Sequence, residues 1–115
     1  MSSRLRMEVL PGFQEDLDAL PDLRTRKMTI DLIVAIRDGT VRGVPLDDRV
    51  ATGDLRDCFK LYFDPIGNVK PRFRLVYRFA SDGITVVAVQ AVAVGRRQGL
   101  DAYLRAARRL DRLPE

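Results

Sequence analysis

The stretch Arg72–Val94, RFRLVYRFASDGITVVAVQAVAV, decides the fold that this sequence predicts. Its first part, Arg72–Phe79, alternates between apolar and basic residues, which is typical of a strand with one buried face. The tripeptide Ser81-Asp82-Gly83 follows and predicts a hairpin turn. Ile84–Val94 is apolar on both faces, which predicts a strand that is covered on both sides.

A further strand precedes this hairpin. Cys58–Phe63 alternates in the same way, and Lys60 and Tyr62 lie on its polar face. The segment 64–68, DPIGN, has the composition of a turn. Lys60 and Arg74 both point away from the phenylalanine-rich sides of their strands. We therefore expect them to share one face of the sheet, and that face is basic.

The N-terminal part predicts a strand and a short helix. Arg4–Leu10 alternates up to Pro11, as expected of a half-buried strand. Phe13–Leu20 has apolar residues at helical spacing and ends at Pro21. The acidic residues of this helix fall on its polar face, so we expect them on the surface: Glu15, Asp16 and Asp18.

Two more helices are predicted. Asp22 is a candidate N-cap for a helix that ends at Gly39, so the first two helices form a hairpin. Residues 40–57 are polar and irregular in pattern. The last helix follows Gly99 and has an apolar stripe of Leu100, Tyr103, Leu104, Ala107 and Leu110.

The order β-α-α-β-β-β-α predicts an α+β fold. Strands joined by short turns pair antiparallel, so we expect a four-stranded antiparallel sheet. The helices, including the helical hairpin, are expected to pack on one face of it. With 115 residues, we expect residues 1–115 to form a single domain.

Composition excludes several classes of site. The chain has no histidine and one cysteine, so it offers neither an imidazole base nor a thiolate zinc cluster. Catalysis would have to come from Lys, Arg, Tyr, Asp or Glu. Ile84–Val94, the longest apolar run, is far short of the roughly 20 residues that span a bilayer. The single cysteine and the lack of a secretory signal fit a cytoplasmic protein.

The net charge of +4 is unevenly distributed along the chain. Residues 1–57 carry nine Lys or Arg and eleven Asp or Glu, whereas residues 58–115 carry eleven and five. The C-terminal half is therefore strongly basic, which suits a polyanionic partner such as a phosphate backbone. An ordinary solvated surface is the alternative explanation.

Several short motifs together resemble a known family. They are DCFK at 57–60, FRLVY at 73–77, VGRR at 94–97 followed by Tyr103, GDL at 53–55 and AARRL at 106–110. In order and spacing they resemble the RelE branch of the RelE/ParE toxins. The resemblance covers the whole chain in element order and is detailed from about Gly53 to Leu110.

The resemblance implies the toxin of a type II toxin-antitoxin system. Such a toxin is an endoribonuclease that cleaves mRNA in the ribosomal A site, by attack of the ribose 2′-OH on the neighbouring phosphate. It needs no metal and no cofactor. The implied partners are a cognate antitoxin protein, mRNA and the ribosome, with no membrane involved.

The resemblance also assigns roles to individual residues. Lys60 matches a catalytic lysine, Arg74 a phosphate-binding arginine and Arg97 a second arginine. Tyr103 matches a tyrosine that stacks on a base or assists proton transfer. We expect the neighbouring cations to bind RNA: Lys70, Arg72, Arg78 and Arg96.

One position departs from the family pattern. A second strand lysine of the family, a proposed general base, is Tyr62 here. We hypothesise that Lys70 or Arg72 supplies the missing cation.

Other interpretations of the same residues stay open. Lys60 and the strand arginines can form an ordinary polar face, Tyr103 can be a core tyrosine, and Arg96-Arg97 can pair with Asp64 or Asp101. At the level of function, the alternatives are a ParE-like toxin that inhibits DNA gyrase without nuclease activity, and a degenerate binding module. ParE-type chains generally lack the pair formed here by Arg97 and Tyr103.

Overall fold

The computed structural model describes residues 5–46, 48–49, 53–67, 70–98 and 101–111. Along the chain the elements are β1 (Arg6–Val9), α1 (Phe13–Asp18), α2 (Leu23–Asp38), β2 (Val44–Pro45), β3 (Asp48–Arg49), β4 (Gly53–Asp54), β5 (Cys58–Phe63), β6 (Phe73–Ser81), β7 (Val86–Arg96) and α3 (Asp101–Arg109). Within these ranges no helix is long and apolar enough to cross a membrane. The α+β class predicted from the sequence is confirmed.

The main sheet has five strands in the order β1-β7-β6-β5-β2, one more than predicted. β5, β6 and β7 pair antiparallel, as expected of strands joined by turns. The extra strand is β2, where Pro45 pairs with Phe59 at the sheet edge, a position that tolerates proline. β1 is parallel to β7, so the expectation of a wholly antiparallel sheet was wrong. The helical connection after β1 lets the chain re-enter the sheet in the same direction.

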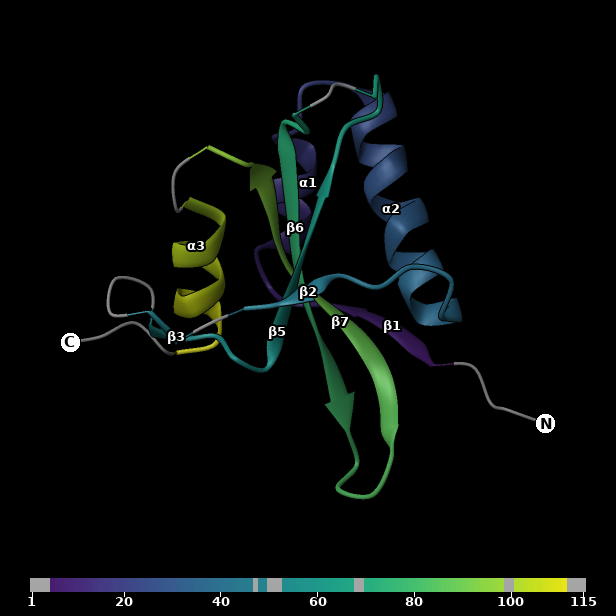
Figure 1. The fold of residues 1–115 in the computed structure, drawn as a ribbon, viewed down its shortest axis with the longest axis vertical. Helices are drawn as coiled ribbons and strands as arrows, with labels where there is room; N and C mark the ends of the chain where they lie inside the picture. Colours follow the sequence, from purple (N-terminus) through teal and green to yellow (C-terminus); the bar gives the residue numbers. More distant parts are fainter. Residues whose placement is uncertain (1–4, 47, 50–52, 68–69, 99–100, 112–115) are drawn as a thin grey trace.

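Helices cover both faces of the sheet, and Figure 1 shows α2 and α3 on opposite sides of it. The expectation that every helix packs on one face was therefore wrong for α3. On the α1–α2 side the core contains Phe13, Leu17, Leu20, Ile33, Ile36, Phe63, Phe73, Leu75, Tyr77, Val89, Ala91 and Val94. On the α3 side it contains Leu46, Leu55, Cys58, Val76, Val92, Ala93, Ala102, Tyr103, Ala106 and Ala107.

The sheet face opposite α1 and α2 is covered by α3 because part of that face is apolar. Cys58, Val76 and Val92 are buried there and would otherwise be exposed to water. The alanines of α3 have small side chains, which allow the helix to pack closely on the strands. The predicted burial of the last strand on both sides is confirmed for Ala88, Val89 and Ala91–Val94. It was wrong for the start of the predicted strand, where Ile84 is 91% and Val86 47% exposed.

The predicted helix caps are confirmed. The Asp22 carboxylate accepts a hydrogen bond of 2.8 Å from the Thr25 backbone N–H, one of the amides left without a partner in the first turn of α2. Gly39 ends the helix with a φ of 83°, in the left-handed region that favours glycine.

Several predicted boundaries need correction. β7 starts at Val86 rather than Ile84, because the Asp82 carboxylate accepts the backbone N–H groups of Ile84 and Thr85 and widens the turn. It also continues past Val94 to Arg96. Residues 40–57, predicted to be irregular, contain three two-residue strands. Three residues of predicted elements lie outside the described residues: Arg4, Asn68 and Leu100.

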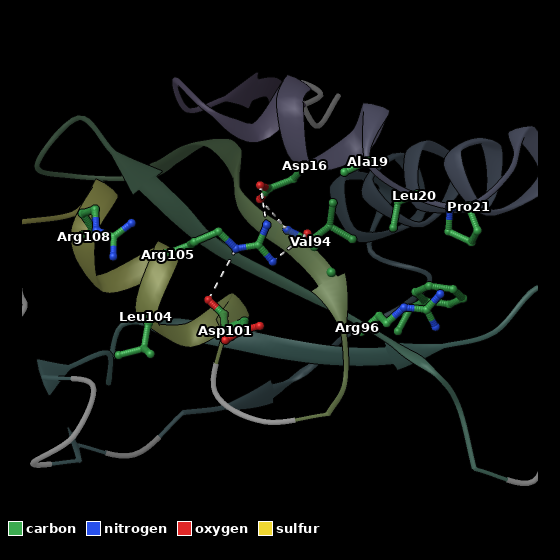
Figure 2. Close-up of a pocket in the computed structure, with 12 residues that line it drawn as sticks. Asp16, Ala19, Leu20, Pro21, Val94, Arg96, Asp101, Leu104, Arg105 and Arg108 are labelled. Atoms are coloured by element: carbon green, nitrogen blue, oxygen red, sulfur yellow. Dashed lines mark hydrogen bonds and ion pairs between the residues drawn. The ribbon is translucent and has the colours of Figure 1, made fainter.

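Asp16 was expected on the surface, and that expectation was wrong. Its side chain is 4% exposed and accepts hydrogen bonds of 2.6 Å from both Arg105 Nη1 and Arg109 Nη1. It also accepts the backbone N–H of Val94. Figure 2 shows Asp16 reaching from α1 toward Arg105 of α3.

The ion pairs of Asp16 with Arg105 and Arg109 lie at an edge of β7 and satisfy backbone groups there. β1 pairs with β7 only as far as Ala91, and among the described residues no strand pairs with the later part of β7 on that side. Asp16 binds the Val94 N–H, and Arg109 donates to the Val92 carbonyl at 2.8 Å. The two helical layers are thereby joined around the sheet edge, and α3 is held in a fixed position. Tyr103 lies on this helix.

Candidate functional site

The candidate site is built around Tyr62 of β5. Tyr62 lies opposite Arg74 of β6 in the strand register, on the face that α3 covers. The guanidinium carbon of Arg97 lies 4.5 Å from the centroid of the Tyr62 ring, and that of Arg74 lies 5.3 Å from it. Lys60 Nζ is also 5.3 Å from this centroid. Three cations thus contact one phenol ring, at distances where cation–π attraction operates.

Arg74 is held between two aromatic rings. Its guanidinium carbon lies 4.1 Å from the centroid of Tyr103 on α3, in addition to its contact with Tyr62. Arg74 is 6% exposed and Tyr103 is 3% exposed. We call Lys60, Tyr62, Arg74, Arg97 and Tyr103 the basic cluster. The structure brings together all four residues that the sequence singled out as catalytic.

Tyr103 has the position of a core tyrosine. Its ring is buried under α3 against Arg74, and its hydroxyl is one of the groups that lower the pKa of Tyr62. In this arrangement Tyr103 packs against Arg74 from the buried side and helps to fix its orientation. Its predicted stacking on an RNA base stays a prediction.

The cluster lowers the pKa of Tyr62. Partial burial raises this pKa, but hydrogen bonds to the phenol oxygen from Tyr103, Lys60 and Arg74, together with the charge of Arg74, outweigh burial. The net effect lowers the pKa from 10.0 to about 8. At neutral pH a larger fraction of Tyr62 is therefore ionised than of an ordinary tyrosine.

The sequence interpretation missed Tyr62 as a candidate functional residue, because it treated the position only as one where the family's lysine is absent. The sequence did contain a pattern that points to Tyr62. Tyr62 follows Lys60 by two residues on the polar face of its strand, and Arg74 was placed on the same face.

Three of the predicted RNA-binding residues line a pocket next to the basic cluster. Lys70, Arg72 and Arg96, together with Arg97, line a pocket of about 440 Å³. The backbone N–H of Arg97 donates to the Arg72 carbonyl at 2.7 Å, which holds the end of β7 next to the start of β6. We call this the basic pocket. Arg97 belongs both to it and to the basic cluster.

Arg72 is engaged by an acidic partner. Its Nε lies 2.8 Å from Asp64 Oδ2 and its Nη2 lies 3.1 Å from Oδ1, and the Asp64 side chain is 2% exposed. Asp64 is thus the partner of Arg72, and both carboxylate oxygens face the guanidinium. The hypothesis that Arg72 replaces the missing family cation loses support for this reason. It stays a prediction for Lys70, which is exposed.

The structure does not bring Arg78 to the cluster. Arg78 Nε donates to Gln90 Oε1 at 2.7 Å, and Gln90 donates in turn to Glu8 Oε1 at 2.9 Å. Arg78 also approaches Asp57 at 3.8 Å. It is four residues beyond Arg74 on β6, a separation of about 13 Å along the strand. Its contacts link β6, β7 and β1 across the sheet.

The chemistry available at the site is anion binding and proton transfer. Guanidinium groups grip two oxygens of a phosphate at once, and a phenol or an amine can carry a proton. In the part of the chain that the structure describes, no three His, Cys, Asp or Glu side chains are placed to hold a metal ion.

Comparisons with known proteins bear on the fold. No family model matches the chain, and neither does any curated protein. A solved structure of a mutant of the E. coli toxin RelE in the free state matches with a TM-score of 0.64 and 16% identity, over 94% of this chain and 99% of that chain. The chain has the RelE fold. A structure of the isolated E. coli RelE toxin matches with a TM-score of 0.54, 17% identity and the same coverage.

The predicted resemblance to RelE is thereby confirmed at the level of the fold. The match extends over nearly all of both chains, so the helices and strands correspond as a whole and not in one motif. At 16% identity, most side chains differ from those of the solved toxin.

Proposed function

We propose that residues 1–115 form the toxin of a toxin-antitoxin system, and that this toxin is an endoribonuclease acting on mRNA in the ribosomal A site. The observation that carries this proposal is the convergence of Lys60, Arg74 and Arg97 on Tyr62, within a RelE fold. Nothing in the strand alternation alone requires three cations to meet at one ring.

The cluster suits cleavage by an internal nucleophile. The ribose 2′-OH must lose a proton, the charge on the phosphorane-like transition state must be neutralised, and the leaving 5′-oxygen must gain a proton. Of the two arginines of the basic cluster, Arg97 is the one more available to the phosphate, because Arg74 is largely covered. Lys60, partly exposed beside Tyr62, is suited to transfer of a proton. The proposed reaction uses no metal and no cofactor.

The basic pocket gives the RNA a second contact surface. Lys70, Arg72, Arg96 and Arg97 line it, and phosphates next to the cut site would be attracted there. The net charge of +4, carried mostly by the C-terminal half, favours approach to the ribosome and its RNA. A cognate antitoxin is the partner expected to silence the protein in the cytoplasm.

Expression in bacteria tests this proposal. We expect wild-type protein to stop growth and to leave mRNA cut inside translated reading frames. A variant with Lys60→Ala and Arg97→Ala should restore growth and leave mRNA intact. The matched control is Arg24→Ala, since Arg24 is exposed on α2, whose helix packs on the other face of the sheet.

The possible outcomes separate the functions considered. Growth arrest with intact mRNA and a DNA-damage response would favour gyrase inhibition, as in ParE-like toxins. Full growth with wild-type protein, confirmed to be folded and expressed, would favour a degenerate binding module. Either result contradicts the ribonuclease proposal.

A further inference from the structure

Tyr62 has a position that a solvated surface tyrosine does not have. Its ring is contacted by the charged groups of Lys60, Arg74 and Arg97, from β5, β6 and the segment after β7. On the side of α3, Tyr103 contributes to the lowered pKa of Tyr62. Three positive charges thus lie within 5.3 Å of the centroid of the Tyr62 ring, an environment that favours a phenolate over a phenol.

We propose that Tyr62 is the group that takes the proton from the attacking 2′-OH of the RNA. This inference rests on the proposed function, and it names a catalytic residue for that reaction. It also gives a physical reason why a tyrosine can stand where the resembling family has a lysine.

The other residues of the cluster are less suited to the task. Tyr103 is 3% exposed, so its oxygen is shielded from a bound ribose. The guanidinium groups of Arg74 and Arg97 do not release a proton under ordinary conditions. Lys60 and Tyr62 are both partly exposed, and Lys60 Nζ lies 5.3 Å from the centroid of the Tyr62 ring. The two side chains are therefore suited to opposite roles, with the amine giving a proton and the phenolate accepting one.

The Tyr62 phenolate accepts the 2′-OH proton and becomes a phenol while the 2′-oxygen forms a bond to phosphorus. The bond from phosphorus to the 5′-oxygen breaks, and the Lys60 ammonium gives a proton to that oxygen. The products are a 2′,3′-cyclic phosphate and a 5′-hydroxyl. A proton then passes from Tyr62 to Lys60, directly or through water, and restores the starting state.

The lowered pKa of Tyr62 supports this assignment. A base with a pKa of about 8 is partly ionised at neutral pH and still strong enough to accept a proton in the transition state. The rate should therefore rise with pH below about 8 and level off above it.

The first test compares wild type with Tyr62→Phe in single-turnover cleavage across pH. Phenylalanine keeps the ring that the cations contact, so the variant should fold and bind RNA with a similar Kd. We expect its cleavage rate to fall about 100- to 10,000-fold, the usual worth of a general base, and its rise with pH to disappear. A Tyr62→Phe rate within about threefold of wild type would overturn the inference while leaving the proposed ribonuclease function intact.

Tyr77→Phe is the matched control, because it also removes one tyrosine hydroxyl. Tyr77 is buried on the α1–α2 side of the sheet, and its hydroxyl accepts the Gly43 backbone N–H there. We expect Tyr77→Phe to be less stable but to cleave at the wild-type rate per folded molecule. If wild type itself cleaves no RNA with or without ribosomes, the proposed function falls and this inference falls with it.

The second test does not depend on activity. The chain has three tyrosines, and burial raises the pKa of Tyr77, so a tyrosinate absorbance transition near pH 8 can be assigned by substitution. We expect the transition in wild type, its loss in Tyr62→Phe, and its movement to higher pH in Lys60→Met, which removes one donor. A wild-type protein without any transition below pH 9 would contradict the inference.

Discussion

The two faces of the sheet are made by the same strands but have different tasks. On the face covered by α1 and α2, β5 and β6 present Phe63, Phe73, Leu75 and Tyr77, which are buried in one continuous core. On the face covered by α3, the same strands present Cys58 and Val76 together with three members of the basic cluster, Lys60, Tyr62 and Arg74. The first face is built for stability. The second face buries fewer apolar side chains and carries positively charged ones instead. We interpret that difference as evidence that the functional site lies on the second face.

The largest effect on stability is expected from breaking the apolar face. Phe73 is fully buried, and Phe73→Ala should lower the free energy of unfolding by about 3–5 kcal/mol. Denaturant unfolding measures this. The cluster residues on the other face are retained, so activity per folded molecule should stay near wild type. A loss below about 1 kcal/mol would contradict the assignment of this face as the main core.

The next effect should come from separating α3 from the rest of the molecule. Asp16→Ala removes the carboxylate that pairs with Arg105 and Arg109, and breaking a buried pair typically costs about 3–5 kcal/mol. We expect the loss in free energy of unfolding to lie near the lower end of this range, because the two arginine side chains are 30% and 17% exposed. Cleavage should also fall, since α3 holds Tyr103 against Arg74.

Asp31→Ala is the control for that change. Asp31 pairs with Lys27 one turn earlier on α2, and both side chains are largely exposed. Its removal should alter the free energy of unfolding by less than about 0.5 kcal/mol. Equal effects of the two substitutions would show that Asp16 does not hold α3.

A substitution in the cluster should separate activity from stability. Arg97 follows β7 and is only partly buried, so Arg97→Ala should leave the melting temperature within a few degrees of wild type. We expect the cleavage rate to fall about 100-fold or more, because a charge that faces the transition state is lost. Loss of folding in this variant would mean that Arg97 is structural.

The smallest effect expected is a pH dependence of stability. The pKa of Tyr62 is lowered in the folded state, so the unfolded chain binds more protons between about pH 8 and pH 10. The free energy of unfolding of wild type should therefore increase relative to Tyr62→Phe as pH rises through that window. The difference should be small because the ring is partly exposed to solvent, which screens the charges. A constant difference across the window would contradict the lowered pKa.

Much of the apolar face could be predicted from local pattern. The alternation of Phe73, Leu75 and Tyr77 fixes one side of β6, and Asp22 and Gly39 fix the ends of α2. These features depend on neighbours within a few residues. The four catalytic candidates were also placed together, because alternation and the family resemblance agreed.

The features that sequence missed depend on contacts between distant residues. Asp16 looks like a surface acid in its own helix, and its partners Arg105 and Arg109 come 89 and 93 residues later. The parallel pairing of β1 with β7 depends on the path of the helical connection, which no local pattern encodes. The environment of Tyr62 depends on side chains from three separate segments, since Lys60, Arg74 and Arg97 meet at its ring only in the folded chain.

The most direct test of the central claim is the chemistry of the cut RNA ends. Purified protein should be given ribosomes carrying a defined mRNA, and then the same mRNA with a single 2′-deoxy nucleotide at the mapped cut site. The account predicts 5′-hydroxyl and 2′,3′-cyclic phosphate ends on the first message and no cut at the substituted position of the second. Cleavage of the 2′-deoxy message at that position, or ends with a 5′-phosphate, would contradict it.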